Sequence, residues 1–439
     1  MQLYQYTLKG WVHPADVFCS LFGDDSAAFW LDREYHPTNR KSIIGHAFGG
    51  KIANLGDVKN KLDDTSANQE AAFGLPGFVG WIEYPSQPSA DYSEHSTESV
   101  RSMLLEVREA MLFDHDTRNI TMVGHFEREA DFEHWVQAIL LRLALAGGEK
   151  AVVLHRAKPA NLGHASVRHS RAEYLELIKK AQQHIAAGDV YQLCLTNQIS
   201  VETDANPLVT FLRLRDSNPA PYACFIRHGN RALVSSSPEQ FFSLSAEGQV
   251  STKPIKGTRA RHVDPVEDAQ VANELQNNAK ERAENLMIVD LMRNDFSKFC
   301  LEGTVQVEKL FDIESYSTVH QLVSTVTGQL DPAINPVSAL LSAFPGGSMT
   351  GAPKLRAQQL IREFESGERG VYSGISGVIG VDGNIEMAMN IRCLVFENGT
   401  VTIGVGGGIT SDSDPAAEFE ETQLKAKALL TVLGASVNW

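Results

Sequence analysis

The chain has 439 residues, of which 43% are hydrophobic and 21% charged, and its formal net charge is −15. This composition is typical of a soluble globular protein, and it argues against nucleic acid as a partner, because no excess of Lys and Arg exists to neutralise phosphates. Five scattered cysteines predict reduced thiols in a cytoplasmic protein. No signal peptide is visible, and no apolar stretch reaches the roughly 20 residues of a membrane helix, so we expect no membrane association.

Two regions follow one another along the chain. Residues 1–150 hold short segments separated by glycines, and the stretch 147–168 is rich in Gly, Ala, Lys and His, which is typical of a surface connection. Residues 165–437 contain the longer predicted elements. A chain of 439 residues is long for one core of ordinary size, which favours two domains or one large composite fold.

Three helices stand out in chain order. Ser170 begins the first, since Glu173 follows at capping-box spacing, apolar residues recur at helical intervals, and Gly188 supplies the stop. A second long helix is predicted over residues 266–292, and because its second half is nearly all apolar, we expect that half to be buried on every side. The last helix is predicted over residues 415–433.

Strand-like segments lie between these helices. They cover residues 192–198, 222–227, 232–236, 374–381, 387–396 and 400–405. Neither an internal repeat nor a low-complexity tract interrupts them. The predicted class is α+β with extensive antiparallel sheet.

Glutamates recur at three-residue spacing in two of the predicted helices. Glu281 and Glu284 share one helix face, and Glu418 and Glu421 repeat the spacing on the last helix. For either pair alone, a solvated helix face is the commoner explanation. If the two pairs converge, they form an oxygen-rich site of the kind that Mg²⁺ prefers when a substrate supplies the remaining ligands.

Two glycine-rich segments are candidates for anion binding. The first, residues 344–354, fails the Walker pattern because Ala352 and Pro353 follow its last glycine, so a nucleotide site is not expected. The second, residues 405–410, follows a strand and could turn several backbone N–H groups toward one anion. Arg392 lies in a predicted apolar strand, where half of a buried ion pair is a slightly more common role than ligand binding.

Lys256 and Glu239 could carry covalent and acid–base chemistry. Lys256 is either a plain surface residue or, if it faces a dry pocket, a nucleophile or base. Glu239 ends a strand in a Ser-Pro-Glu turn and is either a turn residue or a general acid. Together with the glutamate pairs, these residues indicate a divalent-cation enzyme that acts on a small carboxylate.

Taken in order, these segments resemble the chorismate-utilising family, which includes anthranilate, aminodeoxychorismate, isochorismate and salicylate synthases. The segments that carry the resemblance are 237–239, 254–258, 283–291, 293–295, 344–354, 406–408 and 418–422. The resemblance extends over about residues 165–437, the expected catalytic domain. Residues 1–150 match loosely and resemble the N-terminal region of the family. The fold implied is a large two-sheet antiparallel β-sandwich flanked by helices.

The same resemblance implies a magnesium site and a substrate pocket. Glu284 and Glu421 correspond to the closest Mg²⁺ ligands, with Glu281 and Glu418 beside them. Glu239 corresponds to the general acid that protonates the departing C4 hydroxyl of chorismate. The other pocket residues implied, the first three as ligands of a substrate carboxylate, are Arg392, Gly406, Gly408, Thr350 and Tyr372.

Two positions distinguish among the activities of the family. Gln192 stands where isochorismate and salicylate synthases have a water-activating lysine, and glutamine cannot serve as that base. Lys256 stands where anthranilate synthases usually have alanine. A lysine there is typical of the aminodeoxychorismate enzymes, in which it attacks C2 before ammonia adds at C4. The implied activity is therefore synthesis of 4-amino-4-deoxychorismate, for 4-aminobenzoate and folate. Anthranilate synthesis and chorismate binding without catalysis stay open as alternatives.

One position departs from the family pattern. Gln321 stands where the family commonly has histidine, and His320 precedes it. Neighbouring strand residues face opposite sides, so we expect Gln321 rather than His320 to reach the substrate with a hydrogen bond. The sequence shows no Cys-centred glutaminase motif. Since enzymes of this kind receive ammonia from a separate glutamine amidotransferase, we expect such a subunit as a partner.

Overall fold

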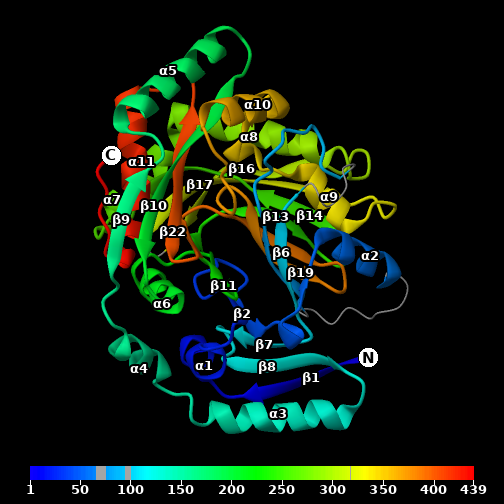
Figure 1. Cartoon of the computed structure of the whole chain (residues 1–439). Helices are drawn as coiled ribbons and strands as arrows, with labels where there is room; N and C mark the ends of the chain where they lie inside the picture. Colours follow the sequence, from blue (N-terminus) through cyan, green and yellow to red (C-terminus); the bar gives the residue numbers. More distant parts are fainter. Residues whose placement is uncertain (66–75, 94–99, 317) are drawn as a thin grey trace.

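The structure is a computed structural model that describes residues 1–65, 76–93, 100–316 and 318–439. Within these residues, two large antiparallel sheets face each other, and helices surround them (Figure 1). The predicted α+β class and the two-sheet sandwich flanked by helices are therefore confirmed. No helix of the described ranges is both long and apolar enough to span a lipid bilayer.

The larger sheet has 12 strands in the described part of the chain. In spatial order they are β1 (Gln2–Lys9), β8 (Asn119–Phe126), β7 (Glu109–Asp114), β3 (Lys41–His46), β2 (Ala27–Asp32), β11 (Tyr222–His228), β12 (Arg231–Ser237), β21 (Cys393–Glu397), β22 (Thr400–Ile409), β10 (Gln192–Thr203) and β18 (Gly351–Ala352), with β9 (Leu162–Val167) also paired to β10. The pairing of β2 with β11 joins a strand from the N-terminal region and one from the middle of the sequence into one sheet.

The smaller sheet has ten strands in the same described ranges. They are, in order, β15 (Ile255–Ala260), β17 (Val319–Gln329), β14 (Gln249–Lys253), β13 (Gln240–Leu244), β20 (Ile385–Met389), β19 (Ile375–Gly380), β5 (Pro76–Ile82), β6 (Ser102–Glu106) and β4 (Ile52–Ala53), with β16 (Gln306–Ser315) paired to β17. Here too an early strand, β5, pairs with a late one, β19.

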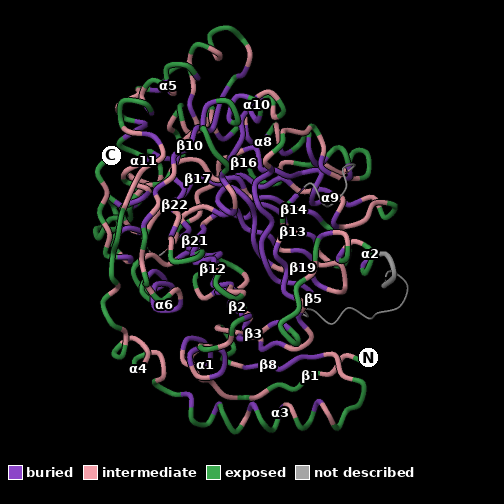
Figure 2. Tube along the Cα trace, viewed as in Figure 1, coloured by how far each residue is buried: buried purple, intermediate pink, exposed green. Residues whose placement is uncertain are grey.

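The helices cover the outer faces and the ends of the sandwich. They are α1 (Pro14–Phe22), α2 (Leu55–Thr65), α3 (Glu129–Leu143), α4 (Glu149–Arg156), α5 (Arg171–Ala186), α6 (Pro207–Ser217), α7 (Pro265–Asn277), α8 (Ala279–Phe296), α9 (Pro336–Ala343), α10 (Lys354–Phe364) and α11 (Pro415–Leu433), with short 3₁₀ turns at Phe48–Gly50 and Gly347–Met349. The strands between them are mostly buried, whereas the outer turns of α3 and α5 are exposed (Figure 2).

Alternation along the strands explains this layering. On β2, Phe29 and Leu31 point into the core between the sheets, while Ala28 and Trp30 point outward and pack with the helices on the other face. Trp30 contacts the ring of Phe211 from α6, with the ring centroids 5.2 Å apart. Each strand of this kind therefore contributes to two hydrophobic cores at once.

Two predicted helices have the expected bounds. The last helix is α11, with the predicted range, and Asp414 caps it. The first is α5, where Ser170 accepts a hydrogen bond from the backbone N–H of Glu173 and the Glu173 carboxylate accepts one from the backbone of Ser170. The stretch 147–168 contains α4 and β9, so it is more regular than its composition suggests. The five cysteines are free thiols, as predicted.

The prediction of one helix over residues 266–292 is wrong. Asn278 has extended backbone angles and separates α7 from α8, and its side-chain oxygen accepts a hydrogen bond of 3.1 Å from the backbone N–H of Glu281. An asparagine in this role ends one helix and caps the next. The expectation that the second half is buried on every side is also wrong, since Leu286 is 44% exposed.

The prediction of one strand over residues 387–396 is wrong as well. The segment forms β20 and β21, and Arg392 lies in the turn between them with a φ of 51°. A non-glycine residue with positive φ cannot continue a strand, so the chain crosses here from the smaller sheet to the larger one. This crossing places Arg392 between the sheets rather than within one.

Candidate active site

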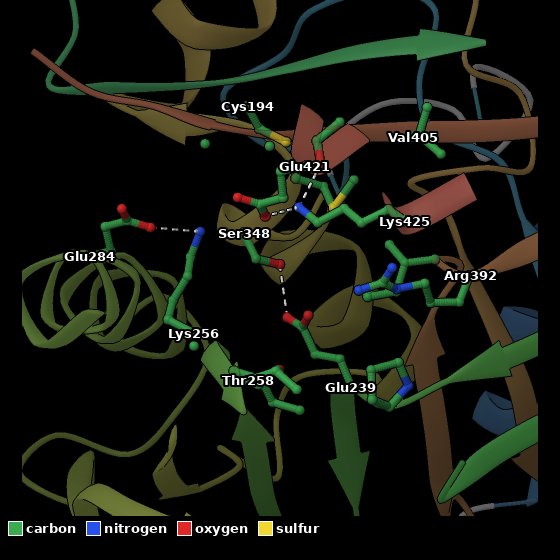
Figure 3. Close-up of a pocket in the computed structure, with 18 of the residues that line it drawn as sticks. Cys194, Glu239, Lys256, Thr258, Glu284, Ser348, Arg392, Val405, Glu421 and Lys425 are labelled. Atoms are coloured by element: carbon green, nitrogen blue, oxygen red, sulfur yellow. Dashed lines mark hydrogen bonds and ion pairs between the residues drawn. The ribbon is translucent and has the colours of Figure 1, made fainter. Parts of the chain in front are cut away.

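A cavity of about 530 Å³ opens between the two sheets and helices α8 and α11. It collects side chains from the turn after β12, from β15 and β22, and from both helices. Of the predicted site residues, it is lined by Glu239, Lys256, Glu281, Glu284, Gln321, Tyr372, Arg392, Gly406, Gly408, Glu418 and Glu421. Gln192 and Thr350 are buried beside it and do not line it. Figure 3 shows the labelled members facing a common space.

Glu239 is held at the cavity wall by two hydroxyl groups. The Ser237 hydroxyl accepts a hydrogen bond from the backbone N–H of Glu239, and the Ser348 hydroxyl donates one of 2.8 Å to its carboxylate. Burial raises the pKa of Glu239 to about 7, although the Ser348 hydrogen bond and the charge of Lys256 act in the opposite direction. A carboxyl group with this pKa carries a proton in a large share of molecules near neutral pH, as a general acid must.

Lys256 reaches the cavity because β15 is irregular at this point. The pairing of β15 with β17 shifts register between Ile255 and Thr258, and Gly257 has a φ of 79°. Such a bulge redirects the neighbouring side chain. A methyl group on Gly257 would lie 2.7 Å from Leu275, so the close packing there also requires glycine.

The Lys256 ammonium faces α8. Its nitrogen lies 3.8 Å from a carboxylate oxygen of Glu284, and both side chains are 14% exposed (Figure 3). Lys256 is therefore not a plain surface residue. The position places one amine and the buried acid Glu239 on the wall of the same cavity.

The two glutamate pairs reach this cavity from different helices. Glu281 and Glu284 come from α8, and Glu418 and Glu421 from α11. Burial raises the pKa of Glu284 despite the nearby lysines. For Glu421, burial acts in the same direction, but the ammonium of Lys425 outweighs it, so the pKa is lowered.

The donor chemistry of this set fits Mg²⁺, because every candidate ligand is a carboxylate oxygen. However, no group of three or more acidic, His or Cys side chains within the described ranges is close enough to hold a metal ion as it stands. Each carboxylate is paired with a cation instead. The pairs are Glu281 with Arg259, Glu284 with Lys256 and Lys280, Glu418 with Lys280, and Glu421 with Lys425.

Arg392 points into the cavity from the turn between β20 and β21 (Figure 3). Among the residues that the structure describes, its guanidinium forms no ion pair, so the expectation of a buried ion pair is wrong. Burial lowers its pKa from the ordinary value of an arginine, and a guanidinium stays charged at any physiological pH. A desolvated cation without an anionic partner is suited to bind a carboxylate.

The glycines of β22 allow close packing on both sides of the strand. A methyl group on Gly406 would lie 2.3 Å from the carbonyl oxygen of Leu195, and one on Gly404 would overlap the ring of Tyr372. Tyr372 lines the cavity, and burial raises its pKa. Glycine at these positions therefore leaves room for β10 and for the ring of Tyr372 at the cavity wall.

Three predicted polar residues differ in their surroundings. Gln321 lines the cavity with a carbonyl oxygen that has no hydrogen-bond partner among the described residues. Gln192 is fully buried, and neither its amide oxygen nor its amide nitrogen has a hydrogen-bond partner among the described residues. A methyl group on Gly408 would lie 2.2 Å from that nitrogen. The Thr350 hydroxyl donates to the carbonyl of Gly346.

His320 faces away from the cavity, as the strand alternation predicts. Its ring nitrogens lie 2.9 Å from Asp268 and 2.8 Å from the hydroxyl of Ser315, on the other side of β17. His320 therefore does not replace the histidine that the family commonly places at the position of Gln321.

Several cavity residues were not predicted from the sequence. Lys425 donates a hydrogen bond of 2.8 Å to the carbonyl oxygen of Gly406 and pairs with Glu421. The spacing of four residues between Glu421 and Lys425 on a helix could have revealed it. The same spacing between Lys280 and Glu284 could have revealed Lys280. Further cavity residues include Cys194, Arg259 and Ser348, which no local pattern singles out.

Comparisons with known proteins agree with this arrangement. Residues 27–431 match the family of chorismate-binding enzymes. Aminodeoxychorismate synthase from Streptomyces griseus is 38% identical, over 95% of this chain and 62% of that protein. Anthranilate synthase component 1 from Streptomyces coelicolor is 36% identical, over 98% of this chain and 88% of that protein. The chain thus spans less than two thirds of the first of these relatives.

The fold also matches a solved structure. The crystal structure of anthranilate synthase component I from Streptococcus pneumoniae superposes with a TM-score of 0.73, at 26% sequence identity, over 91% of this chain and 89% of that one. Both the sequence match and the fold extend over nearly the whole chain. The chain therefore belongs to the family of chorismate-binding enzymes.

Proposed function

We propose that the chain is the aminating component of an aminodeoxychorismate synthase, which converts chorismate and ammonia to 4-amino-4-deoxychorismate. One observation carries the proposal: Lys256 and the buried acid Glu239 line the same cavity as Arg392. Chorismate is a dicarboxylate, and Arg392 and the backbone of Gly406 and Gly408 would hold one of its carboxylates. The name of the Streptomyces griseus relative supports the same reaction.

The proposed chemistry needs an amine and an acid at opposite ends of the conjugated diene of the ring. The deprotonated amine of Lys256 forms a bond to C2, both ring double bonds shift by one position, and the C4–O bond breaks while Glu239 donates its proton to the departing oxygen. Water leaves. Ammonia then forms a bond to C4, both double bonds shift back, the bond between C2 and Lys256 breaks, and a proton returns to Glu239. Hydroxide is a poor leaving group, which is why the acid is required.

Magnesium would be held by Glu284 and Glu421, with Glu281 and Glu418 beside them, and would neutralise the ring carboxylate of chorismate. The residues of this chain do the remaining work. Gln321 would form a hydrogen bond to the substrate, and Tyr372 would close the wall beside the ring. The buried residues Gln192 and Thr350 would support that wall from behind.

Anthranilate synthesis is the second candidate, since the Streptomyces coelicolor relative bears that name at 36% identity. That reaction moves nitrogen to C2 and needs no enzyme nucleophile at that carbon. A lysine within the cavity at position 256 therefore favours the C4 reaction. A protein that binds chorismate without turnover would not need Glu239, Lys256 and the four glutamates in one cavity.

Ammonia is proposed to come from a glutamine amidotransferase subunit, in the cytoplasm. The supporting argument is chemical: the cavity holds no side chain that could release ammonia from glutamine by itself, because such a reaction uses a reactive thiol. Cys194 lines the cavity, but burial raises its pKa, which disfavours the thiolate.

The products distinguish these candidates. Purified protein would be given chorismate, Mg²⁺ and ammonium, with and without aminodeoxychorismate lyase. The proposal expects 4-aminobenzoate only when the lyase is added. Fluorescent anthranilate without the lyase would establish the second candidate instead, and an absence of both products, with or without the amidotransferase, would favour binding alone.

A further inference from the structure

Lys280 lies at the start of α8, at the edge of the cavity, and belongs to no part of the chemistry described above. Its ammonium nitrogen lies 3.9 Å from a carboxylate oxygen of Glu284 and 3.7 Å from one of Glu418. Since Glu284 belongs to α8 and Glu418 to α11, one ammonium group joins the acidic side chains of both helices.

The two carboxylates need a cation, because both are largely removed from water. The side chain of Glu418 is 7% exposed and that of Glu284 is 14% exposed. Glu418 accepts one further hydrogen bond, of 2.7 Å, from the hydroxyl of Ser413. Buried like charges that lack a counter-ion destabilise a fold, so the ammonium stabilises this arrangement.

The four carboxylates act on Lys280 together. All four line the cavity at whose edge the ammonium lies, and the side chain of Lys280 is 57% exposed. A lysine that remains in contact with water carries its charge across the physiological range. It sits in the field that would attract a divalent cation.

We propose that Lys280 is an internal counter-ion for the magnesium site: its ammonium neutralises Glu284 and Glu418 until Mg²⁺ binds, and Mg²⁺ binding displaces it from between them. The inference rests on the magnesium site of the proposed function. It adds that the ion must compete with a cation of the protein itself.

Other cations near the glutamates are less suited to this exchange. Lys425 is tied to the backbone carbonyl of Gly406, and Lys256 is 14% exposed and enclosed by the cavity. Lys280 is 57% exposed, so it can move into water at small cost. A lysine stem is flexible, and within the described ranges the ammonium of Lys280 has ion pairs at 3.7 and 3.9 Å but no hydrogen bond that would hold it in place.

Calorimetric titration of Mg²⁺ into the protein without chorismate tests the proposal. Lys280→Gln removes the competing charge, so we expect the variant to bind Mg²⁺ about three- to tenfold more tightly than the unmodified protein, as one or two partly exposed ion pairs would give. Arg282→Gln is the matched control. Arg282 lies two residues further along α8, stacks on Phe311 and pairs with none of the four glutamates within the described residues.

Three outcomes would overturn the proposal. In the first, Lys280→Gln and the unmodified protein bind Mg²⁺ with the same affinity. In the second, Arg282→Gln raises the Mg²⁺ affinity as much as Lys280→Gln does, which would indicate a general effect of net charge. In the third, neither Lys280→Gln nor the unmodified protein binds Mg²⁺. A circular dichroism spectrum checks that the variants are folded. In a Glu418→Gln background, Lys280→Gln should increase the Mg²⁺ affinity by a smaller factor, because Lys280 has lost one of its two carboxylate partners.

This test is separate from that of the proposed reaction. Calorimetry needs no turnover, whereas product analysis at saturating Mg²⁺ does not depend on how tightly the ion binds. If 4-amino-4-deoxychorismate forms and Lys280→Gln has an unchanged Mg²⁺ affinity, the proposed function is supported and the counter-ion role of Lys280 is contradicted. If Lys280→Gln binds Mg²⁺ more tightly and no product forms, the counter-ion role is supported and the proposed function is contradicted.

Discussion

At Glu239, burial and hydrogen bonding act in opposite directions on the carboxyl group. Burial raises the pKa, whereas the hydrogen bond from Ser348 favours the charged form and lowers it, and the result is about 7. The acid form is the one that the proposed reaction uses. The balance at this residue should therefore be visible in the pH dependence of turnover.

The first prediction concerns that pH dependence. Since Glu239 must be protonated, the slope of the logarithm of the rate against pH should fall as pH rises through about 7, when the concentration of free ammonia is held constant. Ser348→Ala removes the hydrogen bond that favours the carboxylate, so the fall should move to higher pH. Steady-state rates measured from pH 5 to 9 would show it.

Glu239→Gln is the companion variant. A glutamine cannot donate the proton, so the rate should drop by roughly 10²–10⁴-fold, the usual contribution of a general acid. The remaining activity should lose the pH dependence near neutrality. A fall that stayed at the same pH in Ser348→Ala, or persisted in Glu239→Gln, would assign the titration to another group.

Lys256 gives the second prediction. Lys256→Ala and Lys256→Arg should both abolish formation of 4-amino-4-deoxychorismate, because neither side chain can form the bond to C2, although arginine keeps the positive charge beside Glu284. Liquid chromatography of the products would measure this. Lys253→Ala is the control, since Lys253 pairs with Glu314 outside the cavity. Turnover by Lys256→Arg would show that the residue acts only through its charge.

At the scale of elements, the break between α7 and α8 determines where the glutamates of α8 begin. Asn278 caps α8 through the backbone N–H of Glu281, which itself lines the cavity. The third prediction is that Asn278→Ala lowers the free energy of unfolding by about 1 kcal/mol, the usual effect of losing an N-cap. Urea unfolding would measure the change.

Asn277→Ala is the matched control for this cap. The side chain of Asn277 is exposed and donates only within α7, to Asn273, so its loss should change the free energy of unfolding by less than about 0.5 kcal/mol. Equal effects of the two substitutions would mean that the cap does not stabilise α8.

Local signals in the sequence explain which elements could be predicted. The bounds of α5 and α11 follow from capping residues and helical periodicity, both of which lie within a few residues of the helix ends. Asn278 lies in a continuous helical pattern, and although Glu281 follows it at the spacing of a cap and its N3 residue, the continuous pattern favours one helix. The turn at Arg392 is hidden for a similar reason, because strand-like residues surround it and only the crossing between two sheets bends the chain there.

At the scale of the whole molecule, the cavity lies where segments distant in the sequence meet. Its glutamates come from α8 and α11, its amine from β15 and its arginine from the crossing between β20 and β21. The spacing within each glutamate pair is visible in the sequence, but their approach to one cavity depends on long-range packing. The same holds for the ion pair between Lys280 and Glu418, which joins helices about 140 residues apart along the chain.

Family resemblance supplied the roles that geometry alone could not. Most of the predicted site residues line one cavity, whereas Gln192 and Thr350 lie behind its wall. Burial of this kind follows from the packing of β10 against β22 and β18, which a single sequence does not reveal. The roles proposed for all these residues depend on the reaction itself.

The most direct test follows nitrogen to its carbon atom. Protein, chorismate, Mg²⁺ and ¹⁵N-labelled ammonium would be incubated without lyase, and the product examined by NMR. The account predicts ¹⁵N bonded to C4 of a non-aromatic ring that keeps its enolpyruvyl group. An aromatic product with ¹⁵N at C2, together with free pyruvate, would contradict it.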